Sequence, residues 1–286
     1  MSYSEVVTIR SGRHCKHGPP FVVEFVGTPG AGKTTLALRL VSLLDRQAVP
    51  AMAMIDAARP HVARTRVGRV INLVPSASAR RALLWWAFYA FGLAHAVAFA
   101  REHRSLTHLV LRSQLRRPLP LRRRLHILFW HFQLCGRYRF LTTTADTGEV
   151  LVIDDGFLHR AVTLHASHCE QPDSAAIARY LDLAPGPDVI VLTIADRDVC
   201  ETRICERGIW RHSRKLTHPE LARLVGNCEL AADLAVSHAR HRDWVVVGVE
   251  NSRREFARVE ADLARVIAHC IAGSREMPAS DTRHAR

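Results

Sequence analysis

The stretch Gly27-Thr28-Pro29-Gly30-Ala31-Gly32-Lys33-Thr34 decides the fold, because it fits the pattern G-x-x-x-x-G-K-S/T of a phosphate-binding loop. The run before it, Phe21-Val22-Val23-Glu24-Phe25-Val26, is mostly β-branched or aromatic and predicts a buried strand. After it, the apolar residues between Thr34 and Leu44 recur at helical spacing and predict a helix. A strand, a glycine-rich loop and a helix in this order are the context that the motif requires, so we expect a nucleoside triphosphate site.

The residues of this loop have distinct expected roles. Glycines lack a Cβ, so Gly27, Gly30 and Gly32 allow the loop to curl and to direct its backbone N–H groups inward. The helix N-terminus adds unpaired N–H donors and the positive end of the helix dipole, which favour a polyphosphate. Lys33 is expected to reach the β- and γ-phosphates and Thr34 to place its hydroxyl on Mg²⁺. The predicted nucleotide-binding residues are Gly27, Thr28, Pro29, Gly30, Ala31, Gly32, Lys33, Thr34 and Thr35.

Length and composition limit the classes of protein that fit. A chain of 286 residues with 48% hydrophobic and 23% charged residues can bury a sizeable core, which excludes wholesale disorder. The net charge of +13 favours anionic partners, which include nucleotides, nucleic acid and acidic lipid surfaces. Seven cysteines without a repeating framework suit reduced thiols, and the polar N-terminus lacks the apolar core of a secretory signal. We therefore expect a cytoplasmic protein with one domain at 21–272 and tails at 1–20 and 273–286.

A second predicted strand ends in carboxylates. Glu149 to Ile153 forms an apolar run that is followed by Asp154-Asp155-Gly156. A buried parallel strand that ends in an acidic residue delivers a carboxylate to the magnesium shell of a nucleotide site. We assign Asp154 to the metal together with Thr34, and Asp155 to contact with the substrate or acceptance of its proton. Capping of the following helix is the alternative role for Asp155.

Arginines follow the strand that is predicted from Ala48 to Ile55. In open α/β sheets, ligands bind beside the carboxyl ends of the strands, so arginines in the loop after this strand are candidates for holding a substrate phosphate. Solvated surface charge is the alternative reading. These arginines are Arg59, Arg64, Arg66 and Arg69.

Two more arginines follow the buried strand that is predicted from Asp188 to Ile194. A helix is expected from Val199 to Arg207, and it carries Arg203 and Arg207 on one face. Such a pair can close over transferring phosphates and neutralise charge in the transition state, whereas a charged surface helix is the alternative. The chain then continues with a helix from His218 to about Arg240, a strand from Trp244 to Val249 and a helix from Ser252 to Cys270. Asn251 lies in the turn after that strand, where it can approach the purine base.

The segment 76–147 is predicted to be a helical insertion that forms the acceptor region. Its stretch from Ala82 to Ala100 has 19 residues, no formal charge and only His95 as an ionisable group, which is long enough for a membrane span. A single crossing would separate the glycine loop from the carboxylates, so we favour a buried or partner-facing helix. An interfacial helix at the inner membrane surface, or a wall for an apolar substrate, is the alternative.

A basic stretch follows this apolar helix. Pro118 and Pro120 interrupt it and break the helix. A nucleic-acid site is not favoured, because no recognised binding module accompanies the charge. A solvated connection or attraction to acidic headgroups fits better. The arginines are Arg112, Arg116, Arg117, Arg122, Arg123 and Arg124.

The order of these segments resembles the thymidylate-kinase and nucleoside-monophosphate-kinase branch of the P-loop proteins. The matching segments between 21 and 272 are GTPGAGKTT, then VLVIDDG followed by FLHRA, then VIVLTIADRDVCETRICERG, and finally WVVVGVENS. The resemblance implies that the loop binds ATP, that an acidic residue after the third strand serves magnesium and substrate, and that lid arginines assist phosphoryl transfer. It places these roles on Lys33, Thr34, Asp154, Asp155, Arg203 and Arg207.

Two segments depart from the pattern of that branch. Arg59-Pro60 resembles the Arg-Glu-Pro segment that holds the acceptor phosphate, but it lacks the Glu. The Asp-Arg pair after the third strand is Asp154-Asp155 here, and Arg160 follows only later. Arg59 and Arg160 are therefore the candidate substrate-binding residues.

These observations predict a three-layer α/β/α P-loop NTPase fold with a mainly parallel five-stranded sheet and an inserted helical region. The expected activity is magnesium-dependent transfer of the γ-phosphoryl group from ATP to a small acceptor. Thymidylate does not fit well as the acceptor, because 76–147 is longer and more apolar than a thymidylate site needs. The alternative is an ATP-binding or ATP-hydrolysing regulatory or assembly protein that contacts a membrane or a protein partner through 82–100. The sequence leaves a homodimer open.

Overall fold

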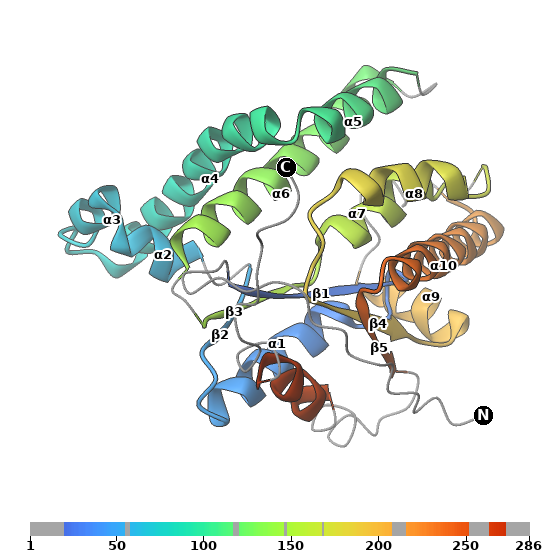
Figure 1. Ribbon diagram of the computed structural model, residues 1–286. Coiled ribbons are helices and arrows are strands. Elements are labelled where there is room, and N and C mark those ends of the chain that lie inside the picture. Colours follow the sequence, from blue (N-terminus) through green and yellow to red (C-terminus); the bar gives the residue numbers. More distant parts are fainter. Residues whose placement is uncertain are drawn as a thin grey trace, which may run out of the picture.

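The computed structural model describes residues 20–54, 58–116, 120–145, 148–167, 169–207, 216–251 and 263–272, without the side chains of 58–60. In these residues five strands form one sheet in which all neighbouring strands are parallel (Figure 1). The strand order is β2 (Ala51–Ala53), β3 (Val150–Ile153), β1 (Phe21–Gly27), β4 (Val189–Ile194) and β5 (Val245–Glu250). The predicted α/β class with a parallel five-stranded sheet is confirmed.

Helices cover both faces of the sheet, so the fold has three layers (Figure 1). On one face, α1 (Lys33–Arg46) and the helix Leu263–Ala272 pack against Val23 and Phe25 of β1. On the other face, Val22 and Val26 of β1 belong to a core that includes residues of α7 (Phe157–His165), α8 (Ser174–Leu183) and α10 (His218–His241). Successive side chains of a strand point to opposite faces, and both faces are buried here. This explains why β1 reads as an almost unbroken apolar run.

The chain leaves the neighbouring strands β1 and β3 in opposite directions. From β1 it runs through α1 toward β2, and from β3 it runs through α7 and α8 toward β4. Right-handed crossovers therefore place α1 and α7 on opposite faces of the sheet. In open α/β sheets such a reversal leaves a crevice at the carboxyl ends of the two strands, and ligands bind there. The loops at this crevice are the glycine loop and Asp154-Asp155-Gly156.

Two predictions near β2 are wrong. The strand is Ala51–Ala53 rather than Ala48 to Ile55, because Ala48 has a φ of 58° and belongs to the turn after α1; Ile55 lies outside the described residues. The arginine-rich segment after it contains two short helices, α2 (Ala58–Arg64) and α3 (Arg66–Ile71), instead of a loop. Thr65 joins them, since its hydroxyl donates to the Val62 carbonyl at 2.7 Å and accepts from the Gly68 N–H at 3.1 Å. One threonine thus ends α2 and caps α3.

The elements after β3 follow the prediction more closely. The helix α9 (Arg197–Glu206) ends before Arg207, which is its C-cap residue. Thr217 and Glu220 form a capping box that starts α10, and the Thr217 N–H donates to the Glu220 carboxylate at 2.8 Å. The last predicted helix is described from Leu263 to Ala272, and 252–262 lie outside the described residues.

Three helices between β2 and β3 form an arm, which comprises α4 (Ala77–Glu102), α5 (Arg104–Arg116) and α6 (Leu121–Thr144) (Figure 1). The helices α4 and α6 lie side by side, and Phe88 of α4 packs edge-to-face against Phe140 of α6. At the closest approach, a Cβ on Gly136 would collide with the backbone of Gly92. The segment that was expected to be a helical insertion is helical, and glycine allows its two long helices to touch.

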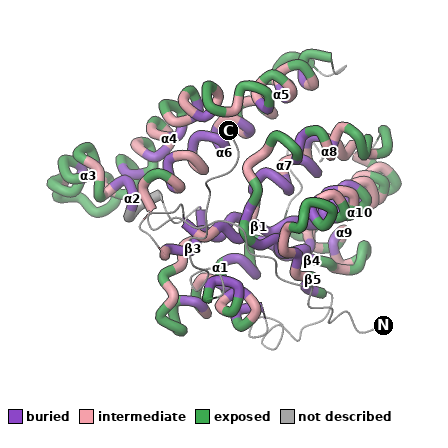
Figure 2. Tube along the Cα trace, in the orientation of Figure 1, coloured by how far each residue is buried: buried purple, intermediate pink, exposed green. Residues whose placement is uncertain are grey.

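The apolar helix α4 is buried on one side only. Figure 2 shows exposed residues along the outer side of the arm. Trp86, Leu93 and Val97 are 75%, 50% and 54% exposed. In the described residues, α4 is the one helix whose length and composition would allow it to cross a membrane, but 28% of its most apolar window is buried inside the molecule. The buried residues of this helix are Leu84, Phe88, Gly92, Ala96 and Phe99.

Candidate functional site

The loop between β1 and α1 depends on glycine at two positions. Gly30 and Gly32 have φ angles of 86° and 91°, a region that L side chains rarely adopt. A Cβ at Gly30 would collide with the Cys200 carbonyl, and a Cβ at Gly32 would collide with the side-chain amide of Asn251. Gly32 is also the N-cap residue of α1, so the loop runs directly into the helix N-terminus. The backbone therefore has the left-handed turns and the helix start that an anion-binding loop needs.

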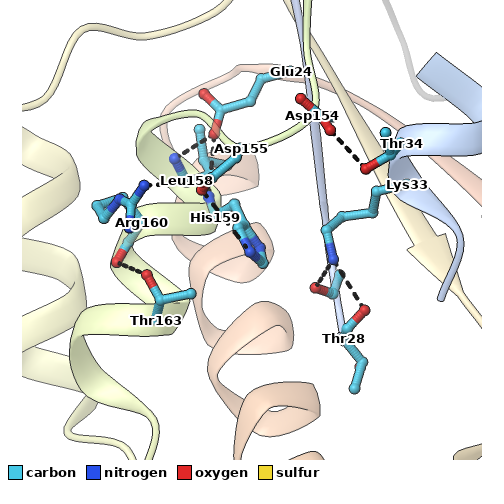
Figure 3. Close-up of polar contacts among 11 residues, drawn as sticks. Glu24, Thr28, Lys33, Thr34, Asp154, Asp155, Leu158, His159, Arg160 and Thr163 are labelled. Carbon is cyan, nitrogen blue, oxygen red and sulfur yellow. Dashed lines mark hydrogen bonds and ion pairs between the residues drawn. The ribbon is translucent and has the colours of Figure 1, made fainter. Parts of the chain in front are cut away.

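Lys33 is buried at the inner edge of this loop (Figure 3). Its ammonium group donates to the Gly27 carbonyl at 2.8 Å and to the Thr28 carbonyl at 3.0 Å. Burial lowers the pKa of Lys33 from 10.5 to about 8, and the nearby carboxylates of Asp155 and Asp154 oppose this shift. The amine is thus fixed by the loop itself, next to the carboxylates that follow β3.

Thr34 and Asp154 bring the two strand ends together. The Thr34 hydroxyl donates to Oδ2 of Asp154 at 2.6 Å (Figure 3). Thr34 is the second residue of α1, and Asp154 follows the last residue of β3. Because β1 and β3 are parallel neighbours, with Glu24 opposite Ile153, the segments that leave them emerge at the same edge of the sheet. This pair is the predicted metal-binding pair.

The donor set of this pair fits a magnesium ion. Mg²⁺ prefers oxygen ligands and is usually bound by one or two carboxylates together with substrate phosphates and water. Thr34 and Asp154 supply a hydroxyl and a carboxylate oxygen. Groups of three or more His, Cys, Asp or Glu side chains suited to a metal are absent from the described part of the chain. The described residues alone therefore do not form a complete metal-coordination shell.

Glu24 is a site residue that the sequence reasoning missed. It lies on β1, is buried, and accepts backbone N–H groups of Leu158 at 2.5 Å and His159 at 3.1 Å at the start of α7 (Figure 3). Burial raises the pKa of Glu24 from 4.5 to about 8, and these N–H donors oppose the shift. A Cβ on Gly156 would collide with this carboxyl group, which explains the glycine after the two aspartates. The feature of the sequence that could have identified Glu24 is a single acidic residue in an otherwise apolar strand.

Asp155 contacts Arg160 rather than capping α7. Oδ2 of Asp155 accepts from Nη2 of Arg160 at 2.9 Å, and the Asp155 side chain is 53% exposed. The N-cap residue of α7 is Gly156, and Glu24 accepts the first N–H groups, so the capping alternative for Asp155 is not observed. Nε of Arg160 is buried without a hydrogen-bond partner among the described residues. The predicted catalytic aspartate and the predicted substrate arginine are therefore adjacent.

His159 lies beside this pair. Its Nε2 is 4.0 Å from Oδ1 of Asp155, and its ring is almost fully buried. Burial is the main cause that lowers the pKa of His159 well below 6.5, and the positive charges of Lys33 and Arg160 add to it. The imidazole is therefore neutral near pH 7 and adds no positive charge to the site.

Arg203 and Asn251 contact the outside of the glycine loop. Arg203 donates to the Gly30 carbonyl and to the Asn251 carbonyl, both at 3.2 Å. The Asn251 side chain is buried and donates to the Ala31 carbonyl at 2.6 Å. A peptide unit is planar and its C=O and N–H point in opposite directions, so the Gly32 N–H points away from Asn251. Both residues therefore hydrogen-bond to carbonyl groups of the loop, whereas the lid role of Arg203 and the contact of Asn251 with the base stay predictions.

The remaining predicted residues do not share the contacts described above for Arg203 and Asn251. Arg207 is exposed at the C-cap of α9. Thr35 is exposed in the first turn of α1, and Pro29 is half-buried in the turn of the glycine loop.

Arg59 lies in α2, but its side chain is outside the described residues. Arg64, Arg66 and Arg69 are exposed on α2 and α3, and Nη2 of Arg64 lies 3.6 Å from a carboxylate oxygen of Glu149. Contact of these arginines with a substrate phosphate stays a prediction.

No family model matches the chain, and no curated protein sequence matches it significantly.

Proposed function

We propose that this chain binds ATP and Mg²⁺ at the glycine loop and transfers the γ-phosphoryl group to a small acceptor, as a relative of the thymidylate-kinase-like branch. The observation that supports this most is the 2.6 Å hydrogen bond between Thr34 and Asp154. It joins a hydroxyl and a carboxylate, both suited to Mg²⁺, beside a buried lysine and a helix N-terminus. Four features of nucleotide chemistry thus meet at one crevice of the sheet.

The residues of the crevice have separate roles in phosphoryl transfer. The N–H groups at the start of α1 bind phosphate oxygens, and Lys33 neutralises charge on the β- and γ-phosphates. Thr34 and Asp154 would hold the metal, which would supply positive charge against the charge that develops between these phosphates. Arg203 and Asn251 hold the loop in shape, so that its N–H groups need no reorganisation during the reaction.

The acceptor side of the site is formed by Asp155 and Arg160. The acceptor hydroxyl oxygen attacks the γ-phosphorus, the bond from this phosphorus to the β–γ bridging oxygen breaks, and ADP leaves. The proton of the hydroxyl passes to the carboxylate of Asp155, which Arg160 orients at 2.9 Å. The guanidinium of Arg160 places positive charge beside Asp155, where it can attract an anionic acceptor.

Two measurements test this function in sequence. Calorimetric titration of the full chain with ATP and Mg²⁺ is expected to show binding that Asp154→Asn weakens. A screen of hydroxyl-bearing acceptors with γ-labelled ATP, with and without lipid or detergent, is then expected to yield a labelled product. Absence of any heat or thermal shift in folded protein would overturn the nucleotide site, whereas binding without any labelled acceptor would overturn the kinase.

A regulatory or assembly ATPase is the second candidate, and the exposed apolar face of α4 is the observation that favours it. A kinase needs its acceptor for rapid turnover, but a switch does not. Measurement of ADP release with and without acceptors therefore separates the two. A nucleic-acid-dependent ATPase would instead require salt-sensitive binding of DNA or RNA.

A further inference from the structure

The positive charge of this chain is concentrated in one region. Residues 58–145 contain 16 of the 40 lysines and arginines but only one of the 27 acidic residues, Glu102. The rest of the chain is close to neutral, with 24 basic and 26 acidic residues. The net charge of +13 is therefore a property of α2, α3 and the arm rather than of the nucleotide-binding half.

Exposed apolar side chains concentrate in the same region. Of the 16 large hydrophobic residues that are exposed in the described chain, 12 lie between 67 and 129. On α4 they form one outward face, because Leu83, Trp86, Leu93 and Val97 follow each other at helical spacing. A surface helix of a soluble domain normally presents charged and polar residues on this face. The outer face of α4 therefore has the composition of a contact surface (Figure 2).

Arginines flank this apolar face at both ends. Arg81 and Arg101 are exposed on α4, and they lie 20 positions apart, which spans about 30 Å of helix. Arg122 and Arg123 are exposed in the first turn of α6. The positive end of the helix dipole disfavours cations at this position, so these two arginines do not stabilise α6. A negative surface outside the molecule accounts for them better than folding does.

We propose that the arm docks on an anionic membrane surface, with the exposed face of α4 at the boundary between headgroups and acyl chains. The arginines contact the headgroups, while Trp86, Leu93 and Val97 insert. The helix lies in the surface and does not cross the membrane, because Phe88 and Phe99 on its other side are buried in the core. Two copies of this surface would repel each other through their charge, so a membrane fits better than a second copy. The proposal does not depend on the proposed kinase activity.

Co-sedimentation with vesicles tests the docking surface. The full chain is mixed with vesicles of phosphatidylcholine alone, or of phosphatidylcholine and phosphatidylglycerol in equal parts, at low and high salt. We expect salt-sensitive binding to the anionic vesicles only. The triple variant Arg116→Gln, Arg122→Gln, Arg123→Gln is expected to lose affinity by about 100-fold, since each arginine near an anionic surface contributes about fivefold in affinity. Trp86→Asp with Leu93→Asp is expected to abolish binding.

Matched variants outside the arm are the controls. The charge control is the triple variant Arg46→Gln, Arg223→Gln, Arg240→Gln, which removes the same charge from exposed positions. The apolar control is Leu38→Asp with Leu230→Asp, which changes residues that are 41% and 39% exposed on α1 and α10. Both controls are expected to bind vesicles as the unaltered chain does. Equal losses in the charge control would overturn the proposal in favour of unspecific attraction. The proposal would also be overturned if the unaltered chain does not bind vesicles but forms a dimer, and if Trp86→Asp with Leu93→Asp converts this dimer to a monomer. The exposed face of α4 would then bind a second copy of the chain.

Unfolding midpoints and fluorescence complete the test. The altered side chains are exposed, so the midpoint of thermal unfolding is expected to stay within a few degrees of that of the unaltered chain. Vesicles with brominated acyl chains are expected to quench tryptophan fluorescence, because an interfacial helix lies about 5–10 Å deep. Quenching that is equally strong in Trp86→Phe would overturn insertion of this face.

Discussion

The hydroxyl of Thr34 lies 2.6 Å from the carboxylate of Asp154, although 120 residues separate the two in the sequence. The contact exists because β1 and β3 are parallel neighbours, so that the segments after both strands emerge side by side. The 87 residues from the start of α2 to the end of the arm, which intervene between β2 and β3, do not disturb it, since they leave from the sheet edge and pack on one face.

Replacement of either partner should therefore weaken the magnesium-dependent part of ATP binding. Asp154→Asn and Thr34→Val each remove one proposed ligand, and bonds of this charged kind contribute about 1.5–3 kcal/mol, or about 10- to 100-fold in affinity. Titrations with ATP in the presence of Mg²⁺ or of a chelator measure the difference. Ser42→Ala is the control, because Ser42 is exposed farther along the same helix and is not one of the predicted nucleotide-binding residues. The same dependence on Mg²⁺ in all variants would contradict the assignment.

Removal of the loop lysine should abolish transfer and leave the fold intact. Lys33→Ala takes away the charge proposed for the β- and γ-phosphates, and the loop retains its glycines. Burial already disfavours the charged form of Lys33, whose pKa is lowered to about 8, so its loss is not expected to unfold the protein. Product formation and the midpoint of thermal unfolding should be measured on the same sample. Unchanged turnover would remove Lys33 from the mechanism.

The glycine loop and the acidic turn could be predicted because their signals are local. Glycine spacing, a β-branched run before the loop and a 3.6-residue period after it all lie within about two dozen residues. The meeting of Thr34 with Asp154 follows as soon as the sheet is parallel, since the carboxyl ends of neighbouring strands then share one edge. The five-stranded parallel sheet was predicted on the same grounds.

The roles of Arg203 and Glu24 could not be predicted, because they depend on tertiary packing. Arg203 faces the loop backbone since Cys200, one turn earlier on α9, is buried against it. Spacing gives the relative positions of two arginines on a helix but not the rotation of that helix toward its neighbour. Glu24 has a partner only when α7 begins beside β1, and its N–H donors lie 134 and 135 residues away. The capping role of Thr65 was not predicted, because two short helices in an arginine-rich segment are difficult to distinguish from a loop in the sequence.

Substitutions of Arg203 and Arg207 should have different effects on ATP affinity. If Arg203 supports the loop, Arg203→Met leaves the Gly30 and Asn251 carbonyls without a donor and weakens ATP binding by about tenfold, at a cost near that of one charged hydrogen bond. Arg207→Met, at the exposed C-cap of the same helix, is the matched control and should bind ATP as the unaltered chain does. Equal loss of turnover in both variants with unchanged ATP affinity would support the lid role instead.

The contact between α4 and α6 should not tolerate a methyl group at Gly136. A Cβ there meets the Gly92 carbonyl, so Gly136→Ala forces the two helix backbones apart and should lower the free energy of unfolding by about 1–3 kcal/mol. Gly226→Ala on α10 is the control, because its Cβ would meet only the mobile end of the Arg197 side chain. The helix propensity gained at Gly226 should leave stability unchanged or raise it by up to about 1 kcal/mol. Urea unfolding curves distinguish the two outcomes, and equal effects would contradict the close approach.

Glu24 should make the fold less stable as the pH rises from 6.5 to 8. Its pKa is raised from 4.5 to about 8, so in this range the folded chain keeps a proton that the unfolded chain has released, and the free energy of unfolding falls by about 2 kcal/mol. His159, His131 and Lys33, whose pKa values burial lowers, act in the opposite direction in this window, because at these groups the unfolded chain binds more protons than the folded chain. The difference between the unaltered chain and a variant of Glu24 removes their contribution. Glu24→Gln still offers an oxygen to the Leu158 and His159 N–H groups but cannot titrate. The unfolding free energy of the unaltered chain minus that of Glu24→Gln, measured in urea, should therefore fall by about 2 kcal/mol across this range. The same pH dependence in both proteins would contradict the assignment to Glu24.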